Sequence, residues 1–277
     1  MATVPTQIFM ETSGLAVPAA LPVPGDSYVQ SLARGLAVIR SFSAQSPRQT
    51  LSEVAGRAQL TRAGARRILL TLQTLGYVQS DGKLFRLTPR ILDLGFAYLS
   101  SLPLWNLAEP VMEELVGQIK ESCSAAVLDG ADIVYVLRVP THKIMSISLG
   151  VGSRLPAYCT SMGRMLLSAL PPEAMMKVLQ TSDRAERTRY TVTNVDELAA
   201  KISKVRRQGW ALVDQELEEG LISMAAPVTD RAGQTIAAIN IGGQANRTSA
   251  KVMQETMLPL LLAAAQSIST RLAMQRS

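Results

Sequence analysis

Three arginines within six residues, Arg62, Arg66 and Arg67, are the side chains whose type and spacing point most directly to chemistry. Apolar residues recur through the same segment at helical spacing, which predicts a helix with one face turned toward its own domain. The arginines fall on the opposite face, near the start of that helix. Because a guanidinium pairs well with guanine O6 and N7, the pattern predicts a recognition helix for the DNA major groove. The alternative is that these arginines contact only phosphates or form ordinary solvated surface.

The expected contacts to DNA extend beyond these arginines. Small residues next to Arg62 let the backbone approach a groove floor, and basic residues on a following hairpin either contact the sugar-phosphate backbone or stay solvated. Hydroxyl residues at the start of the preceding helix either meet a phosphate or cap that helix. The candidate DNA-binding residues are Thr50, Ser52, Thr61, Arg62, Ala63, Gly64, Arg66, Arg67, Lys83 and Arg86.

Three predicted helices position these side chains, at about residues 29–42, 51–58 and 61–75. Thr61 is the candidate N-cap of the third helix, and Gly76 fits the residue at which it stops. The first helix is expected to bury Leu32, Leu36 and Ile39. The third is expected to bury a stripe that comprises Ala65, Ile68, Leu69, Leu72 and Leu75.

A hairpin is predicted directly after the third helix. Apolar and polar residues alternate in 77–80 and 83–87, on both sides of Asp81 and Gly82. An Asp-Gly pair in this position predicts a tight turn whose residues need positive φ. Three helices followed by a hairpin describe a winged helix-turn-helix.

The charge distribution agrees with a nucleic-acid partner for this part of the chain. The chain has 277 residues and a formal net charge of +6. Residues 26–90 contain ten lysine or arginine residues against three acidic ones, whereas residues 91–277 contain eighteen of each sign. Excess positive charge confined to one segment indicates a polyanion such as double-stranded DNA. A basic surface that only confers solubility is the alternative.

The composition argues against several classes of protein. Cys123, Cys159 and the single histidine, His142, are too few for a disulfide framework or a multi-histidine metal site. We find no Gly-x-Ser-x-Gly, His-Glu-x-x-His or Walker-type motif, so we expect no catalytic site, metal or cofactor. We expect buried, reduced thiols and a loop histidine. Without a long apolar run or a signal peptide, a cytoplasmic chain with no membrane partner is expected.

Four segments are expected along the chain: a proline-rich flexible arm, a winged helix-turn-helix domain, a linker helix and a C-terminal domain, at 1–25, 26–88, 89–103 and 104–277. In the last segment, helices are expected at 104–120, 160–170, 172–179, 195–208 and 249–274, the final one kinked or divided by Pro259. Strands are expected at 125–128, 133–139, 144–149, 210–213, 222–228 and 235–241. Antiparallel strands with helices to one side predict an α+β fold.

Several blocks of sequence, in the right order, resemble the IclR-type bacterial transcriptional regulators. In the N-terminal half they are residues 31–39, 51–55, 60–67 and 75–78; in the C-terminal half they are 152–164, 216–220, 225–228 and 237–241. The segment Leu60 to Arg67 is most similar to the branch that controls aromatic-acid catabolism, which includes protocatechuate and β-ketoadipate pathway regulators. The resemblance covers about residues 28–277, and Gly64 departs from the hydroxyl residue or alanine of many members.

The resemblance implies a GAF-like effector-binding domain and no catalysis. It implies a homodimer or tetramer that binds a palindromic promoter site, with RNA polymerase as a candidate partner and a small aromatic or dicarboxylic acid as effector. The hypothesis in competition is an enzyme for small carboxylates with an accessory DNA-binding module, which would need a base and a nucleophile close together. A DNA-bending architectural protein would leave the large, electrically balanced second domain without a role.

An effector pocket for a carboxylate needs hydrogen-bond donors in an otherwise apolar cavity. Thr160, Ser161 and Met162 stand near the start of a predicted helix, where free N–H groups favour an anion. By similarity to the family, the effector-contacting positions are Ser161, Met162, Leu221, Ser223, Asn240 and Gly242. For each, an ordinary core or capping role is the alternative.

Two arginines could add a cation to that pocket. Arg138 is expected to share one strand face with Val134 and Val136, and it either protrudes near the strand end or points into the pocket. Arg154 is the second candidate, with a structural ion pair as the alternative.

Overall fold

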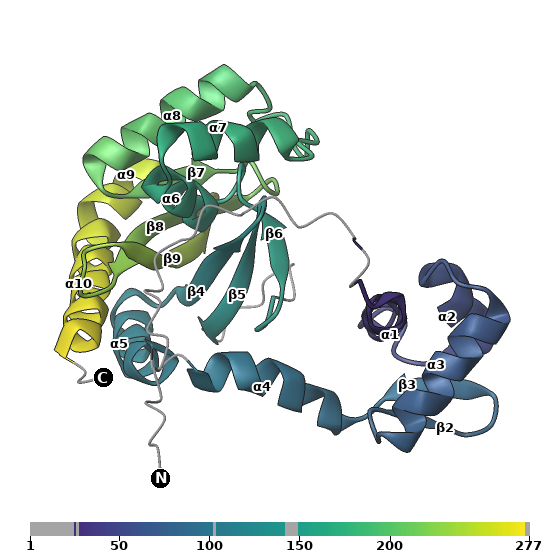
Figure 1. Ribbon diagram of the computed structural model, residues 1–277. Coiled ribbons are helices and arrows are strands. Elements are labelled where there is room, and N and C mark those ends of the chain that lie inside the picture. Colours follow the sequence, from purple (N-terminus) through teal and green to yellow (C-terminus); the bar gives the residue numbers. More distant parts are fainter. Residues whose placement is uncertain (1–24, 26–27, 102–103, 142–148, 275–277) are drawn as a thin grey trace, which may run out of the picture. The chain divides into compact units, whose positions relative to one another are not determined.

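The computed structural model describes residues 25, 28–101, 104–141 and 149–274 (Figure 1). The chain divides into two compact units at residues 102 and 103, and each unit is considered by itself. The expected arm, apart from Gly25, lies outside the described residues. So do His142 and the expected strand at 144–149, apart from Leu149.

The N-terminal unit has the winged helix-turn-helix organisation. Its elements are α1 (Gln30–Arg40), β1 (Gln49–Thr50), α2 (Leu51–Arg57), α3 (Arg62–Thr74), β2 (Val78–Ser80), β3 (Leu84–Leu87), the 3-10 turn η1 (Pro89–Ile91) and α4 (Leu92–Ser101). The strands form an antiparallel sheet in the order β1-β3-β2. The two-residue strand β1 was not predicted, because it is too short to show alternation. The buried core of the N-terminal unit consists of Val38, Val54, Leu69, Leu72 and Val78.

Two expectations about buried faces in this unit are wrong. The fully buried residue of α1 is Val38, whereas Leu32 and Leu36 are 64% and 41% exposed. Leu75 is half exposed rather than part of the inward stripe of α3. Apolar spacing shows that a helix has an apolar face, but the neighbouring elements decide which side they cover.

The hairpin turn differs from the expected two-residue type. Ser80 pairs with Phe85, and only Gly82 in the turn has a positive φ, of 97°. The side chain of Asp81 holds the longer turn, because its Oδ1 accepts hydrogen bonds from the N–H groups of Lys83 and Leu84 at 3.1 and 2.8 Å. These two backbone donors lower the pKa of the Asp81 carboxyl.

The C-terminal unit is built on an antiparallel sheet. Its described strands follow the order β6-β5-β4-β9-β8-β7. They are β4 (Ser122–Asp129), β5 (Asp132–Val139), β6 (Arg154–Pro156), β7 (Ala211–Asp214), β8 (Leu221–Thr229) and β9 (Thr235–Gln244). The edge strand β6 was not predicted because it is only three residues long. An antiparallel sheet packed with helices agrees with the expected α+β class.

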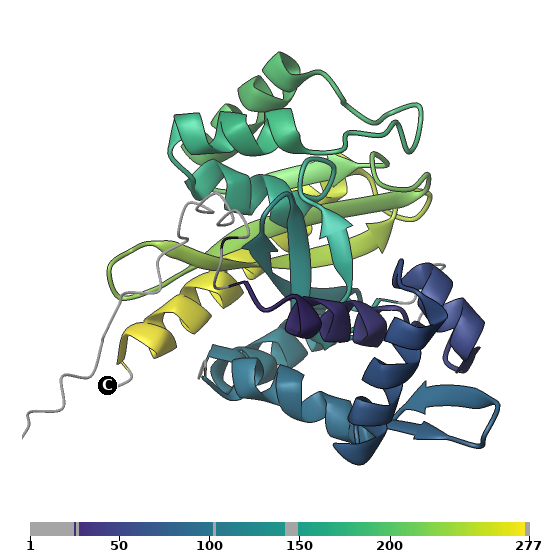
Figure 2. The ribbon, with the colours of Figure 1, turned by 45° about the vertical axis from the view of Figure 1, so that its right-hand side comes forward.

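Helices cover both faces of this sheet, which corrects the expectation of helices on one side only. The green helices α6 (Ser161–Ala169), α7 (Pro172–Thr181) and α8 (Val195–Gln208) lie on one face, while α5 (Leu104–Ile119) and the yellow helix α10 (Leu258–Met274) lie on the other (Figures 1 and 2). The double cover explains why β8 and β9 are apolar on both faces: neighbouring residues such as Met224 and Ala225 are both fully buried.

The C-terminal helical segment is continuous but irregular at the expected place. A short helix α9 (Ala250–Val252) and a π-helical turn η2 (Met253–Met257) lead into α10, whose second residue is Pro259. Proline fits the first turn of a helix because its missing N–H would have no intrahelical partner there. Within the described residues, Ala250–Met274 is long and apolar enough to span a membrane by length and composition alone. Such a helix is weak support for a membrane span, since α10 packs on α5 and β8 as a core helix does.

A β-bulge in β5 reverses the face on which its last residues lie. Ala125 of β4 pairs with Leu137, but the next residue, Ala126, pairs with Tyr135, so Val136 is an extra residue in β5. Regular alternation would put Tyr135 and Arg138 on opposite faces, because they are three residues apart. The extra residue brings both onto the face that α6 covers, which corrects the grouping of Arg138 with Val134 and Val136.

Candidate functional site

The exposed face of α3 presents the arginines that the sequence singles out. Arg62, Arg66 and Arg67 are exposed, while Ala65 and Leu69 on the opposite side are fully buried. Among the described residues, none of the three arginines forms an ion pair with an acidic side chain. Their charge is therefore available to phosphate and base-edge acceptors.

Local hydrogen bonds explain the start of α3. Thr61 is the N-cap, and its Oγ1 accepts a hydrogen bond from the N–H of Gly64 at 3.1 Å. A Cβ atom on Gly64 would lie 3.2 Å from that oxygen, which is tight for this contact. The small residue at position 64 therefore leaves room for the cap, and Ala63 beside it is exposed.

Of the two hydroxyl residues at the start of α2, Thr50 takes the capping role that the sequence left open. Thr50 takes part in a capping box: its Oγ1 accepts from the N–H of Glu53, and its own N–H donates to Glu53 Oε2 at 2.7 Å. The Thr50 N–H and the Thr50 hydroxyl both donate to the Glu53 carboxylate, and these two hydrogen bonds lower the pKa of that carboxyl. Thr50 thus has a structural role in α2, whereas Ser52 is exposed on the first turn.

The hairpin carries basic side chains beside the recognition helix. Lys83 and Arg86 are exposed, and Arg86 lines a shallow hollow together with Arg48 and Asp81. Sequence reasoning missed Arg48. No local signal places it there, because Arg48 reaches the wing through the two-residue strand β1, which pairs with β3 of the hairpin.

The C-terminal unit contains a cavity of about 590 Å³, its open mouth included, against the face of the sheet that α6 covers. It brings together all the expected effector residues except Arg154, namely Arg138, Thr160, Ser161, Met162, Leu221, Ser223, Asn240 and Gly242. The lining residues that sequence reasoning missed are Ser122, Ser124, Tyr135, Leu149, Cys159, Val213 and Leu217. We call this cavity the effector pocket, after the role that the sequence leads us to expect for its lining residues.

Strand register explains why distant residues meet in the pocket. Ser124 of β4 pairs with Arg138 on one side and with Asn240 on the other, so the three form a row across the sheet. Gly242 pairs with Ser122 and with Ser223 in the neighbouring row. Sequence reasoning missed the serines on β4 because pairing between β4 and β9 joins residues more than a hundred positions apart.

Polar groups of two kinds at the pocket suit an anion. Arg138 is the charged side chain among the described lining residues, and its Nη1 lies 3.4 Å from Ser124 Oγ. At the start of α6, Thr160 caps the N–H of Gly163, and its carbonyl accepts from Arg164. The N–H groups of Ser161 and Met162 precede these and have no partner within the helix, which favours a negative charge there.

Asn240 is held with its donor end available. Its Oδ1 accepts a hydrogen bond from the N–H of Ser124 at 3.1 Å. Asn240 is buried, with 9% of the residue exposed, and its amide nitrogen has no hydrogen-bond partner among the described residues. A carboxylate or carbonyl oxygen in the pocket would supply that partner.

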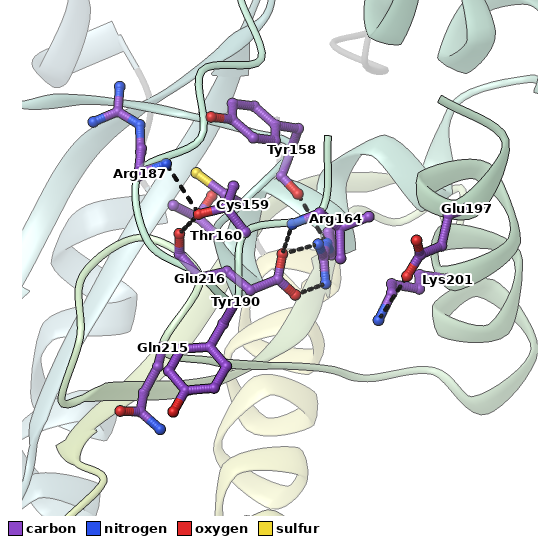
Figure 3. Close-up of polar contacts among 12 residues, drawn as sticks. Tyr158, Cys159, Thr160, Arg164, Arg187, Tyr190, Glu197, Lys201, Gln215 and Glu216 are labelled. Atoms are coloured by element: carbon purple, nitrogen blue, oxygen red, sulfur yellow. Dashed lines mark hydrogen bonds and ion pairs between the residues drawn. The ribbon is translucent and has the colours of Figure 1, made fainter. Parts of the chain in front are cut away.

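A buried ion pair fixes α6, and hence the pocket, in place (Figure 3). The Arg164 guanidinium donates to both carboxylate oxygens of Glu216 at 2.8 and 2.6 Å, and its Nε donates to the carbonyl of Tyr158. Glu216 Oε2 also accepts from the N–H of Val192. Because Leu217 lines the pocket directly after Glu216, this pair connects the start of α6 with a second wall.

The effector role expected for Arg154 is not supported by its position. Arg154 lies on the edge strand β6, where it donates to Asp129 Oδ2 at 2.6 Å and approaches Asp132 Oδ2 at 3.3 Å. Its side chain is 47% exposed, and it does not line the pocket. The structural ion pair, weighed as the alternative, describes it.

Burial keeps the titratable neighbours of the pocket neutral. It raises the pKa of the Cys159 thiol to about 11 and the pKa of the Tyr135 phenol to about 12. The pKa of Cys123 is also raised by burial. Neither thiol is a thiolate near neutral pH, so neither provides the activated nucleophile that the enzyme hypothesis needs.

Comparison with known proteins places both units in one family. Residues 31–82 match the IclR helix-turn-helix domain, and residues 96–270 match the C-terminal domain of bacterial transcriptional regulator IclR. The chain is 43% identical over 246 residues to the Pca regulon regulatory protein of Pseudomonas putida, covering 88% of this chain and 84% of that protein. It is 35% identical over 241 residues to the p-hydroxybenzoate hydroxylase transcriptional activator of Acinetobacter baylyi, covering 85% and 89%.

A solved structure agrees with these relatives. The crystal structure of an IclR homolog complexed with 4-hydroxybenzoate from Microbacterium hydrocarbonoxydans superposes with a TM-score of 0.79 at 26% identity, covering 88% of this chain and 100% of that one. The matched families and relatives are transcriptional regulators rather than enzymes. The chain therefore belongs to the IclR family of DNA-binding bacterial transcriptional regulators.

Proposed function

We propose that this regulator controls genes of aromatic-acid catabolism and responds to a small aromatic acid, or to a dicarboxylic acid from ring cleavage, bound in the effector pocket. The observation that carries the proposal is the pocket itself, in which Arg138 and the start of α6 converge among apolar walls such as Met162 and Leu221. A carboxylate at this place gains charge-assisted hydrogen bonds in a site largely shielded from water. The relatives named for the Pca regulon and for p-hydroxybenzoate hydroxylase support the same class of effector.

We propose DNA contacts by Thr61, Arg62, Ala63, Gly64, Arg66 and Arg67 on α3, and by Lys83, Arg86 and Arg48 beside it, with residues 26–88 as the DNA-binding domain. The target is promoter DNA in the cytoplasm, where RNA polymerase is the expected further partner. Supporting this assignment, the basic side chains of α3 are exposed while its apolar side is covered.

We also propose that the chain acts as a homodimer or a tetramer of such dimers. Leu92, Leu94 and Phe96 on α4 are 69%, 51% and 69% exposed, which is unusual for large apolar side chains on one short helix. A second copy of the same helix is a cover of matching chemistry, and twofold pairing suits a palindromic site. An effector that prefers one dimer arrangement over another then changes the spacing of the two recognition helices, with residues 89–103 as the transmitter from the effector domain at 104–277.

A thermal-shift and calorimetry screen tests the effector class. Benzoate, hydroxybenzoates, 3,4-dihydroxybenzoate and six-carbon dicarboxylates are added to the full chain. A true effector raises the melting temperature in proportion to the logarithm of its concentration above Kd, with stabilisation of roughly 2.7 kcal/mol at a hundredfold excess over Kd. Ser161→Ala and Asn240→Ala should weaken binding, and Ser203→Ala on α8, outside the pocket, should not. If no acid stabilises the chain, or if both pocket variants bind like the wild type, the assignment is wrong.

A further inference from the structure

Tyr135 is a buried residue of the effector pocket whose hydroxyl group the fold does not use. Its side chain is 5% exposed and lines the pocket. Its hydroxyl has no hydrogen-bond partner among the described residues, whereas Tyr158, which belongs to the same apolar core, donates its hydroxyl to the carbonyl of Ala185 at 2.5 Å. A ligand that fills the pocket would cut this hydroxyl off from water, so a ligand oxygen that supplies a hydrogen-bond partner is favoured.

The bulge at Val136 gives Tyr135 this position. Because of the extra residue, Tyr135 and Arg138 lie on the same face of β5, next to Ala126 and Ser124 of β4. The positive charge of Arg138 also acts on the phenol of Tyr135, which agrees with their common place in the pocket. The fold thus sets a neutral phenol beside a cation in one cavity.

The two groups suit different parts of a ligand. A carboxylate is best served by charge-assisted hydrogen bonds, which Arg138 and the N–H groups of Ser161 and Met162 can donate. The phenol stays protonated far above neutral pH, since burial raises its pKa to about 12. It can therefore both donate to and accept from an uncharged oxygen.

We propose that Tyr135 determines effector specificity by hydrogen-bonding an uncharged oxygen, a ring hydroxyl or a chain carbonyl, that the effector carries in addition to its carboxylate. This inference rests on the proposed function and narrows it to oxygen-substituted acids. A pocket built around such a hydrogen bond discriminates against the analogue that lacks the oxygen, because the buried phenol is then left unpaired.

Matched pairs of acids test the proposal by calorimetry on the full chain. Each pair differs by one oxygen: benzoate and 3-hydroxybenzoate, benzoate and 4-hydroxybenzoate, and adipate and 3-oxoadipate. In the wild type, the oxygen-bearing member of at least one pair should bind about tenfold more tightly or better. Tyr135→Phe should reduce that ratio to nearly one by weakening the oxygen-bearing acid, and the plain acid should keep its Kd. Tyr190→Phe, which removes a hydroxyl from an exposed tyrosine outside the pocket, is the matched control and should keep the ratio.

The outcomes separate this inference from the proposed function. Acids that bind without discrimination in every pair, or a Tyr135→Phe protein that keeps the wild-type ratio, would overturn the role of Tyr135 and leave the effector class standing. Failure of all the acids to bind the wild type would overturn both. The wild-type ratios alone can still overturn the inference if the variant folds poorly, because they need no substitution.

Discussion

At the residue scale, hydrogen bonding separates arginines that build the protein from arginines that are left for ligands. Arg164 donates to Glu216 and to a backbone carbonyl, and its side chain is 3% exposed. Arg154 is engaged by two aspartates at the surface. Arg62 and Arg66, in contrast, are exposed and without an acidic partner among the described residues, which is what a DNA-contacting role requires.

Arg62→Ala and Arg66→Ala should each weaken binding to promoter DNA by about 1–3 kcal/mol if these side chains read bases. The loss of affinity should be larger on a selected site than on scrambled DNA. Removing a contact to phosphate alone would weaken binding to the two duplexes equally. Fluorescence anisotropy at one fixed salt concentration measures it, on a duplex selected from a random pool. Arg231→Ala, an exposed arginine of the other unit, is the control. Unchanged affinity in both variants would show that α3 is not the recognition helix.

At the element scale, the start of α6 depends on a close approach of two backbones. A Cβ atom on Gly163 would lie 2.2 Å from the carbonyl oxygen of Ala157, and backbone cannot yield as a flexible side chain does. The glycine allows the segment before α6 to fold against the helix. This approach brings Thr160, Ser161 and Met162 to the pocket.

Gly163→Ala should lower the free energy of unfolding by about 1–3 kcal/mol or more, because the new methyl group overpacks a rigid contact. It should also weaken effector binding by displacing the start of α6. Gly117→Ala is the matched control: this glycine lies inside α5 with nothing within 4 Å of the added Cβ, so alanine should stabilise by up to about 1 kcal/mol. Urea denaturation measures both changes, and a Gly163→Ala protein as stable as the wild type would contradict the argument.

At the scale of the whole molecule, the distribution of charge agrees with one unit for DNA binding and one for effector binding. The N-terminal unit carries the excess of basic residues, and the C-terminal unit carries the pocket and a balanced charge. The exposed apolar residues of α4 stand between the two in sequence. A single copy leaves these residues in water, so the functional protein is expected to contain more than one chain.

If α4 forms the proposed dimer contact, Leu94→Asp should convert the dimer into a monomer, since a charge in a desolvated apolar contact is strongly unfavourable. Size-exclusion chromatography with light scattering measures the change in mass. Val151→Asp places the same charge on an apolar residue of the other unit that is 56% exposed, and it should leave the mass unchanged. A dimer that survives Leu94→Asp would exclude α4 from the interface.

Local signals account for what could be predicted about the N-terminal unit. The N-cap at Thr61, the stop at Gly76 and the arginines between them depend on interactions within a few residues, and the structure has the helix at Arg62–Thr74. In the C-terminal unit, the pocket positions were predicted from the family resemblance. Related chains share a tertiary fold, so positions that meet in their pocket are expected to meet in this one. Neither route identified Tyr135 as part of the pocket.

The sequence by itself determined the helices, the caps of α2 and α3, the charged face of α3 and the class of protein. Only the tertiary structure decided that Leu32 stays exposed, that Arg154 pairs with two aspartates, and that Tyr135 joins Arg138 in the pocket. The physical reason is range. Periodicity and capping depend on near neighbours in the chain. Burial, and the face on which the residues of a bulged strand lie, depend on partners that are far away in sequence.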